Sequence, residues 1–397
     1  MPTMTGVADR VPVRLGIFVT HPIQYFAPLW RSLAATHGLD LKVHFFSDHS
    51  VRGGIDPGFG VSVAWDVPVL EGYPHEFITR DAPWQKPGRV SLPDVRNRIR
   101  REHFDAVLVH GYSARFERQV LRIARAAGVR TLLRGEFAEV IPFDGRSAWK
   151  SVLRTIYLRR LYSRIDAFCH LGEEGRIHLV RHGVPGDKMF FSPYAVDTEL
   201  FEKQVCSLDR AQCRQELGIE EDQVVLLFSG KLIPKKAPLL LVEALRRLPR
   251  LEKVVLLVVG DGEQRAQVER DARAVLGDRL LMPGFVNQSA IGRYYASADI
   301  FVMPSHYETW GLVVNEAMQF SLPVVVSTSV ACHRDLVVGD ETGMVFHDGD
   351  VESLARGLAR FIGDPSLRRQ AGEQARKRIA AYSIEASAAG IRRALGL

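Results

Sequence analysis

The sequence contains two successive series of short apolar runs, and segments with helical periodicity separate the runs within each series. Such an alternation predicts parallel βαβ units, because each buried strand must be followed by a helix that crosses back over the sheet. In the first series the expected strands are residues 13–19, 41–47, 104–110, 129–135 and 166–171. The expected helices are residues 26–35, 114–127 and 148–164. The first half of the chain is therefore predicted to form one doubly wound α/β domain.

A polar segment, residues 202–222, interrupts the pattern and is interpreted as an interdomain linker. In the second series the expected strands are residues 224–229, 254–260, 280–285, 300–304 and 323–327. The expected helices are residues 239–248, 263–275, 289–296, 312–320, 351–362 and most of 368–397. A chain of 397 residues is too long for one compact core. We therefore predict two Rossmann-like domains with a cleft between them, residues 1–205 and 206–379, and a C-terminal helix over residues 380–397.

The composition indicates a globular protein with an excess of positive charge. Hydrophobic residues make up 46% of the chain, and no apolar run approaches the roughly 20 residues that span a bilayer. The formal net charge of +6 suits a phosphorylated substrate, an anionic lipid surface or a nucleic acid. We recognise no nucleic-acid-binding module and expect no nucleic acid as partner. The four cysteines form no Cys-x-x-Cys pair, so we expect no zinc, no disulfide framework and a cytoplasmic setting.

The densest basic segment is residues 146–164, and it contains no acidic residue. Its basic residues are Arg146, Lys150, Arg154, Arg159, Arg160 and Arg164. Apolar residues recur through the same segment at helical spacing, from Trp149 to Leu161. We interpret the segment as a helix that packs its apolar face on the core and exposes its basic face to water. The alternative is peripheral contact with anionic lipid at the inner face of a membrane.

Two glutamates lie eight positions apart directly after the expected strand at residues 300–304. Glu308 is expected in the loop that follows this strand, and Glu316 inside the helix that begins near Gly311. The backbone N–H groups at the start of that helix would meet an anion. A nucleotide-sugar fits this layout, with Glu308 on sugar hydroxyls, the helix end on phosphate and Glu316 on ribose hydroxyls.

A lysine-rich turn, residues 229–238, follows the first strand of the second series and opens a helix, for which Pro238 suits the first turn. We call this segment the lysine loop. Lys231 and Lys236 bracket the turn, and their ammonium groups could neutralise a diphosphate leaving group. The Gly-x4-Gly-Lys spacing of a P-loop is absent.

Residues 304–318, in which a Pro-Ser pair, Trp-Gly-Leu and Glu-Ala-Met surround the two glutamates, resemble the Glu-x7-Glu signature of retaining glycosyltransferases. The resemblance is to glycosyltransferase family 4, of the group 1 type, whose fold is GT-B. The lysine loop resembles this family's Gly-Arg-Leu-x-Pro-x-Lys-Gly element, with Lys231 in place of the usual arginine and Ala237 in place of a frequent glycine. The resemblance covers nearly the whole chain and implies that the C-terminal helix crosses back to the N-terminal domain.

The resemblance also implies a role for each matching residue. Lys231 and Lys236 would stabilise the charge of the leaving group, and Glu308 would orient the hydroxyls of the donor sugar. His110 would contact the sugar or the acceptor. The residues implied to hold the nucleotide-sugar are Glu316, Trp310, Gly311, Leu312, Gly284, Phe285, Val286 and Gly230. The implied reaction is transfer of a hexose-type sugar to a hydroxyl with retention at the anomeric carbon, without a metal or other cofactor. We expect UDP as the nucleotide, ahead of GDP.

Polar residues follow three expected strands of the first series, where the carboxyl ends of parallel strands meet at one edge of the sheet. They are His21, Gln24 and Tyr25 after the first strand, His110 at the end of the third, and Arg134 and Glu136 at the fourth. We predict that they form the acceptor pocket, for a carbohydrate, a lipid-linked or a small-molecule acceptor. The long excursion of residues 53–93 either binds carbohydrate through its Asp, Trp and Tyr residues or is held down by its own aromatic side chains.

Other functions remain open at this level. A different GT-B enzyme, such as a UDP-sugar epimerase, would turn over a nucleotide-sugar without an acceptor. A phosphorylase of the glycogen type would need a pyridoxal lysine and a much longer chain. A catalytically silent subunit that only binds nucleotide or carbohydrate would have no need of the paired lysines and glutamates.

Overall fold

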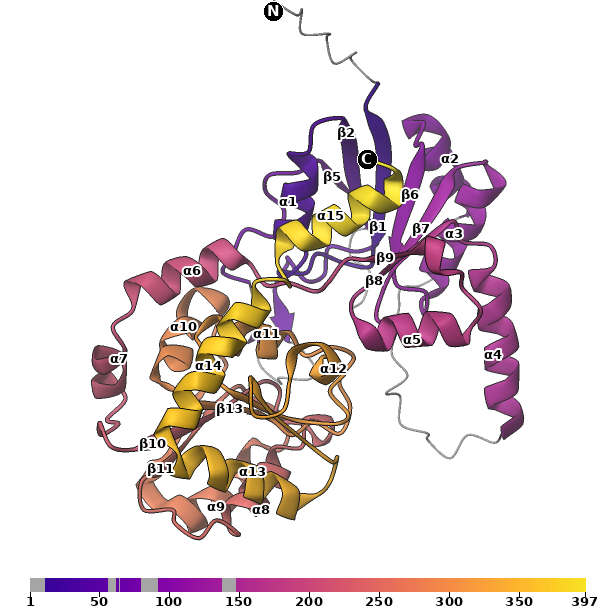
Figure 1. Cartoon of the computed structure of the whole chain (residues 1–397). Coiled ribbons are helices and arrows are strands. Elements are labelled where there is room, and N and C mark those ends of the chain that lie inside the picture. Colours follow the sequence, from indigo (N-terminus) through magenta and orange to yellow (C-terminus); the bar gives the residue numbers. More distant parts are fainter. Residues whose placement is uncertain (1–10, 56–61, 64, 80–91, 138–147) are drawn as a thin grey trace, which may run out of the picture.

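A computed structural model of the chain describes residues 11–55, 62–63, 65–79, 92–137 and 148–397. It contains two parallel sheets in two α/β domains, which follow one another in the sequence (Figure 1). The N-terminal sheet has seven strands in the order β5-β2-β1-β6-β7-β8-β9, and the C-terminal sheet has six in the order β12-β11-β10-β13-β14-β15. The predicted pair of Rossmann-like domains is thus confirmed.

The elements of the first half are β1 (Val13–Val19), α1 (Ala27–Ala34), β2 (Leu39–Phe45), β3 (Gly54–Ile55), β4 (Ser62–Val63), β5 (His75–Phe77), α2 (Leu92–Glu102), β6 (Ala106–His110), α3 (Arg115–Ala126), β7 (Arg130–Arg134), α4 (Ala148–Tyr162), β8 (Ala167–His170), α5 (Glu173–Arg181), η1 (Gly186–Lys188) and β9 (Met189–Phe191).

The elements of the second half are α6 (Thr198–Ser207), α7 (Arg210–Glu216), β10 (Val224–Ser229), η2 (Pro234–Lys236), α8 (Pro238–Leu245), β11 (Val254–Val259), α9 (Arg265–Leu276), η3 (Gly277–Arg279), β12 (Leu280–Gly284), α10 (Gln288–Ser297), β13 (Ile300–Met303), α11 (Leu312–Gln319), β14 (Val324–Ser327), α12 (His333–Leu336), β15 (Gly343–Phe346), α13 (Val351–Gly363), α14 (Pro365–Ile379) and α15 (Ile384–Leu395).

The central strands are buried on both faces, which explains their continuous apolar sequences. All six residues of β10 are buried, and so are all six of β11. Alternate residues of β10 pack into different hydrophobic clusters: Leu227 lies in the cluster shared with the N-terminal domain, and Leu226 in a cluster confined to the C-terminal domain. In each sheet the order of the strands reverses beside the first central strand, β1 or β10, and the carboxyl ends there are the expected place for a ligand.

The last two helices of the chain pack against different domains (Figure 1). Helix α14 packs against α11 and α13 of the C-terminal domain, whereas α15 packs against α1, β8 and β9 of the N-terminal domain. The hydroxyl of Ser383 accepts a hydrogen bond from the N–H of Ala386 and caps the start of α15. The predicted return of the C-terminal helix is therefore present.

Some boundaries differ from the prediction. The short edge strands β5, β9 and β15 were not predicted, because three or four residues carry too little periodicity. The predicted linker contains α7 and the end of α6, and the predicted domain boundary at residue 205 falls inside α6. Capping carboxylates, Asp197 and Asp209, start these two helices.

The interpretation of residues 146–164 as a core-packed helix is wrong for its first turns. Helix α4 exposes 60% of Trp149 and 50% of Ile156, and it buries only residues of its later turns, such as Leu158 and Tyr162. Its early turns extend beyond the body of the domain (Figure 1). Because apolar residues occupy both faces of this helix, periodicity alone could not tell which face is buried. Residue 146 lies outside the described part.

Replacing Gly390 by alanine should loosen the contact of α15 with β9. An added Cβ would lie 2.0 Å from the carbonyl oxygen of Phe191, so the helix would have to shift. We expect the free energy of unfolding to fall by about 1–3 kcal/mol, as measured by urea denaturation. Gly363→Ala, at the end of α13, is the matched control because no atom lies within 4 Å of its added Cβ. Equal stability of the two variants would contradict this packing.

Candidate functional site

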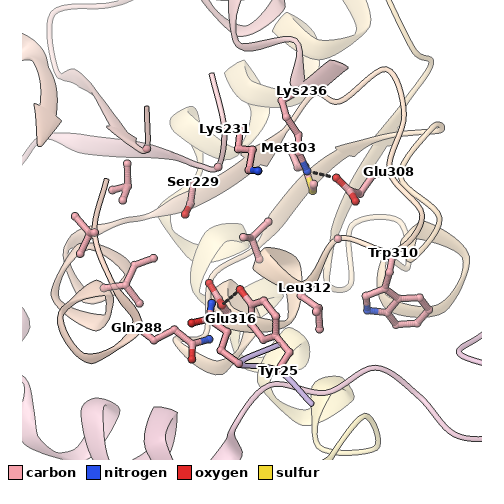
Figure 2. Close-up of a pocket in the computed structure, with 18 of the residues that line it drawn as sticks. Tyr25, Ser229, Lys231, Lys236, Gln288, Met303, Glu308, Trp310, Leu312 and Glu316 are labelled. Atoms are coloured by element: carbon pink, nitrogen blue, oxygen red, sulfur yellow. Dashed lines mark hydrogen bonds and ion pairs between the residues drawn. The ribbon is translucent and has the colours of Figure 1, made fainter. Parts of the chain in front are cut away.

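A cavity of about 310 Å³ lies between the two domains at the carboxyl ends of the central strands. We call it the donor cavity. From the C-terminal domain it is lined by the lysine loop, by the turn after β12 and by the start of α11, and from the N-terminal domain by Tyr25, Glu136 and Tyr194 among others. Figure 2 shows Lys231 and Lys236 on one side of this cavity and Glu316, Tyr25 and Gln288 on the opposite side. Of the residues predicted to hold the nucleotide-sugar, all but Gly284 line this cavity.

The lysine loop is shaped by a tight turn. Lys236 ends the short helix η2, and Ala237 follows with φ of 50°, in the left-handed region that favours glycine. Pro238 then begins α8, as predicted. The ammonium group of Lys236 forms an ion pair with the carboxylate of Glu308 (Figure 2). One predicted phosphate ligand and one predicted sugar ligand thus neutralise each other in the structure.

Glu316 is nearly inaccessible, with 1% of its surface exposed. Its carboxylate accepts a hydrogen bond of 2.8 Å from the hydroxyl of Tyr25 and one of 2.7 Å from the hydroxyl of Tyr295. Burial raises the pKa of Glu316, while the two tyrosine hydroxyls oppose that shift. Tyr25 was predicted to face the acceptor but lies on the donor side instead, because its hydroxyl crosses the cleft to Glu316 (Figure 2).

The start of α11 points into the donor cavity. Gly311 has φ of 106°, and an added Cβ would lie 3.1 Å from a methyl group of Val330, so only glycine fits this position. Leu312 and Glu308 line the cavity on either side of it. Trp310 is also in the lining, but its indole N–H donates to the side-chain oxygen of Asn315 at 3.0 Å and most of the ring is buried. Its main role in the structure is therefore to hold this turn.

The turn after β12 forms the end of the cavity predicted for the nucleobase. Gly284 ends β12 with φ of 87°, and Phe285 and Val286 line the cavity. Gly230 at the end of β10 lines it as well. Sequence reasoning missed Gln288, because a glutamine that starts an ordinary helix carries no signal of its own.

A second cavity of about 590 Å³ opens beside the first, and we call it the acceptor cavity. It shares Glu136, Tyr194 and Thr309 with the donor cavity and also contains His110. Thr309 donates to Glu136 at 2.6 Å, and the hydroxyl of Tyr194 donates to the other oxygen of Glu136 at 3.1 Å. Glu136 therefore joins the two domains at the point where the cavities meet.

His110 lies in the acceptor cavity, where burial and its hydrogen-bond partners keep the imidazole neutral. Burial, with the nearby Arg134 guanidinium as the second cause, holds the pKa of His110 well below its usual value. The guanidinium of Arg134 can only donate, so Nδ1 of His110 accepts in the contact of 3.4 Å between them. The proton of the neutral ring is then on Nε2, which donates to the hydroxyl of Tyr194 at 3.1 Å. The imidazole is neutral and fixed in one orientation.

Arg134 and His21 do not line either cavity, contrary to the prediction. The guanidinium of Arg134 is buried and donates to the hydroxyls of Ser192 and Ser387 at 3.2 Å each, so it links β7 to α15 and lies behind His110. The ring of His21 lies 4.6 Å from the ring of His49 and is tilted by 43° to it. Burial, followed by the charge of His49, lowers the pKa of His21 to about 4. Gln24 lines the donor cavity rather than the acceptor cavity.

Glu117 is a cavity residue that the sequence analysis missed. It lies at the start of α3, lines the acceptor cavity and accepts the N–H of Ala114 at 2.7 Å. Burial raises the pKa of its carboxyl to about 7. A glutamate three residues after a helix N-cap was the available signal, since that spacing is typical of a capping box.

The described part of residues 53–93 contributes one residue to the donor cavity, Trp65. Asp66 accepts a hydrogen bond from Ser289 of the C-terminal domain, and Tyr73 is buried in the core. Part of this excursion is thus held by its own buried aromatic side chain, and whether Trp65 contacts carbohydrate stays a prediction. Residues 56–61, 64 and 80–91 lie outside the described part.

Within the described ranges, no three His, Cys, Asp or Glu side chains converge as metal ligands would. In the same part of the chain, no helix is both long enough and apolar enough to cross a bilayer.

Part of the chain is similar in sequence to known glycosyltransferases. Residues 209–378 match the family model described as Glycosyl transferases group 1. A D-inositol 3-phosphate glycosyltransferase of Xylanimonas cellulosilytica is 30% identical over 246 residues, which is 60% of this chain and 58% of that protein. An alpha-D-kanosaminyltransferase of Streptomyces kanamyceticus is 31% identical over 195 residues, 47% of this chain and 50% of that protein. The chain spans between 50% and 58% of the length of the first curated relatives that it matches.

Solved structures match along nearly the whole chain. HepE of Anabaena, in complex with UDP and glucose, aligns with a TM-score of 0.70 at 16% identity, over 97% of this chain and 99% of that one. Sucrose-phosphate synthase of Thermosynechococcus elongatus aligns with a TM-score of 0.68 at 20% identity, over 97% and 98%. The fold is therefore GT-B. The C-terminal domain carries the glycosyl transferases group 1 match.

Glu117→Gln should change how stability depends on pH. Burial raises the carboxyl pKa from its ordinary 4.5 to about 7, so between these values the native state keeps a proton that the unfolded chain has released. Stability therefore falls as pH rises through this window. Glutamine keeps the cap and does not titrate, so the loss of unfolding free energy from about pH 5 to pH 8 should be about 2 kcal/mol smaller in the variant. Urea titrations of the wild type and the variant at the two pH values measure this difference. Equal losses of unfolding free energy in the two proteins would contradict the burial of an acid here.

Proposed function

We propose that the protein is a retaining glycosyltransferase of family 4 that moves a hexose-type sugar from a UDP-sugar to a hydroxyl acceptor. The observation that supports this best is the donor cavity, in which two lysines face a buried glutamate across the N-terminus of a helix. The similarity of the C-terminal domain to glycosyl transferases group 1 supports the same reaction class. UDP is preferred over GDP because the aligned HepE structures contain UDP and UDP-glucose.

The donor would lie with its diphosphate between the lysine loop and the start of α11. The ammonium groups of Lys231 and Lys236 and the backbone N–H groups after Gly311 supply the positive charge that a diphosphate needs. The base would occupy the turn of Phe285 and Val286, and ribose would hydrogen-bond Glu316. Ribose hydroxyls would take the place of the Tyr25 hydroxyl, which already shows that Glu316 accepts hydrogen bonds from O–H donors.

The ion pair between Lys236 and Glu308 would be exchanged when the donor binds. Both side chains are more than four-fifths buried, so neither charge is well solvated once its partner leaves. The diphosphate would become the partner of Lys236, and the sugar hydroxyls the partners of Glu308. The protein thus keeps both groups paired before and after binding.

Transfer would follow a front-face route. As the bond between the anomeric carbon and the diphosphate oxygen breaks, that oxygen takes the proton of the acceptor hydroxyl, which attacks from the same face. The lysines stabilise the charge that develops on the leaving group, which is the largest electrostatic demand of the step. Glu308 supports positive charge at the sugar ring. The acceptor hydroxyl would enter from the acceptor cavity, past Glu136 and Thr309, and neutral His110 would help to position it.

The acceptor cavity also separates this proposal from its alternatives. An epimerase of the same fold needs no second substrate, whereas here a cavity of about 590 Å³ adjoins the donor cavity and shares lining residues with it. Measuring whether UDP-sugar is consumed only when a hydroxyl acceptor is added distinguishes the two.

Carbohydrate, lipid-linked and small-molecule acceptors all remain within the proposal, as does peripheral membrane contact through α4. A thermal-shift panel of nucleotides and UDP-sugars identifies the donor first, because a bound ligand stabilises the folded state.

Lys236→Ala should lower kcat by about 100-fold or more, because one positive charge is lost where the leaving group develops negative charge. Glu316→Ala should chiefly raise KM for the donor. Lys253→Ala is the control: this exposed lysine pairs with Asp222 and is outside the described lining of both cavities. Steady-state kinetics with the identified donor give all three values. Unchanged kinetics in both site variants would contradict the assignment.

Activity should persist in excess EDTA, since in this proposal lysines and backbone N–H groups stabilise the diphosphate. Initial rates measured before and after chelation, and again after adding Mg²⁺, test this. A strict requirement for the added metal would show that the account of leaving-group stabilisation is wrong.

A further inference from the structure

A third cavity, of about 1080 Å³, lies between helices α3 and α4, and it is lined by an unusual number of arginines. Both helices lie at the same edge of the N-terminal domain (Figure 1), and the end of α4 with the turn after it faces α3 across this cavity. The arginines are Arg118, Arg122 and Arg125 from α3, and Arg160 and Arg164 from α4 and the turn after it. We call this cavity the arginine hollow.

The positive charge of the arginine hollow is not neutralised in the described structure. None of the five guanidinium groups forms an ion pair with a carboxylate there, and none of the described residues that line the hollow is acidic. Arg125 donates to the backbone carbonyl of Arg164 at 2.8 Å, which orders the side chain but leaves its charge in place. Five like charges around one space repel one another, so the hollow favours an anion.

The residue type and its spacing point to phosphate. Arg118, Arg122 and Arg125 recur at helical spacing along one face of α3, and Arg160 and Arg164 lie one turn apart facing them. A guanidinium offers a planar pair of donors that matches two phosphate oxygens. Arginines from two sides of a hollow can therefore hold one or two phosphate groups.

The exposed apolar face of α4 indicates where that phosphate comes from. Trp149, Val152, Leu153 and Ile156 are each exposed by 50–60%, and they lie on the turns that precede the basic end of the helix. An apolar row with an aromatic residue beside clustered arginines is typical of a segment that lies in the interface of an anionic membrane. The apolar side chains enter the acyl boundary, and the arginines meet the headgroups.

The arginine hollow adjoins the acceptor cavity, because Arg118 and Tyr157 line both. We propose that the arginine hollow, with the apolar row of α4, binds the headgroup phosphates of an anionic phospholipid membrane and presents the acceptor cavity to the membrane surface. That the acceptor is itself lipid-linked rests on the proposed function, whereas binding to the membrane does not.

The test is cosedimentation of the full chain with phosphatidylglycerol vesicles and with phosphatidylcholine vesicles. The wild-type protein should bind the anionic vesicles at least 10-fold more tightly, and added salt should weaken that binding. Arg122→Gln combined with Arg160→Gln should reduce the affinity about 30-fold, which corresponds to about 1 kcal/mol for each lost charge. Arg250→Gln combined with Arg369→Gln removes the same charge from exposed sites of the C-terminal domain and should change the affinity less than about 3-fold.

A fluorescence measurement tests the apolar row independently. Binding to anionic vesicles should shift tryptophan emission to the blue, and Trp149→Phe should remove most of that shift. Circular dichroism and thermal melting of each variant show that it is folded, without requiring any transferase activity. A failure of the proposed function would therefore not affect the reading of the vesicle experiments.

Several results would overturn the inference. Binding that is equal for the two lipids, or undiminished in the double variant of the arginine hollow, would show that the arginines do not meet headgroups. Stabilisation by glycerol 1-phosphate that is lost in this variant, with no vesicle binding, would assign the hollow to a soluble phosphate ester. Concentration-dependent dimers in light scattering that disappear in Leu153→Ser would assign the apolar row to a second copy of this chain.

Discussion

The hydrogen bonds of the buried Glu316 carboxylate are the constraint on which the arrangement of the two domains depends. One partner, Tyr295, belongs to the C-terminal domain, and the other, Tyr25, reaches across from the turn after β1. An ionised carboxylate without these donors would be costly at this depth. Burial and the adjacent carboxylate raise the pKa of the Tyr25 hydroxyl well above its usual value, so it remains protonated and donates. The site that is proposed to bind ribose is thus also one of the contacts that join the domains.

Neighbouring contacts reinforce this closure. The side-chain amide of Asn315 donates to the carbonyl of Tyr194 at 3.1 Å, and Thr309 donates to Glu136. Both contacts start from the loop and helix that carry the two glutamates, and both end on residues of the N-terminal domain. A donor that replaces Tyr25 on Glu316 would therefore change the bonding between the domains as well as fill the cavity. This coupling would link donor binding to the exposure of the acceptor cavity.

Much of the fold follows from sequence alone. The strands β1 and β10 begin and end where their apolar runs predict, because a strand buried on both faces is a continuous apolar segment. The positions of Glu308 in a loop and Glu316 in a helix also follow, since Gly311 marks the boundary between them. Short edge strands could not be predicted from the sequence. The three residues of β9, for example, are positioned by their pairing with β8.

The site was less predictable wherever a residue acts across the cleft. Arg134 was placed correctly at a strand end, but its burial under α15 depends on a helix more than two hundred residues later in the chain. Tyr25 was assigned to the acceptor, although its hydroxyl binds a glutamate of the other domain. The exposed face of α4 could not be recognised, because its apolar residues resemble those of a core helix. Each of these outcomes depends on contacts between distant segments, which local patterns do not contain.

The most direct test of the account is a crystal structure of the protein with a bound UDP-sugar. The account predicts the diphosphate within hydrogen-bond distance of Lys231 and Lys236, a ribose hydroxyl on Glu316 in place of the hydroxyl of Tyr25, and Glu308 released from its ion pair to face the sugar. A nucleotide bound outside the donor cavity, with the Tyr25–Glu316 and Lys236–Glu308 contacts intact, would contradict it.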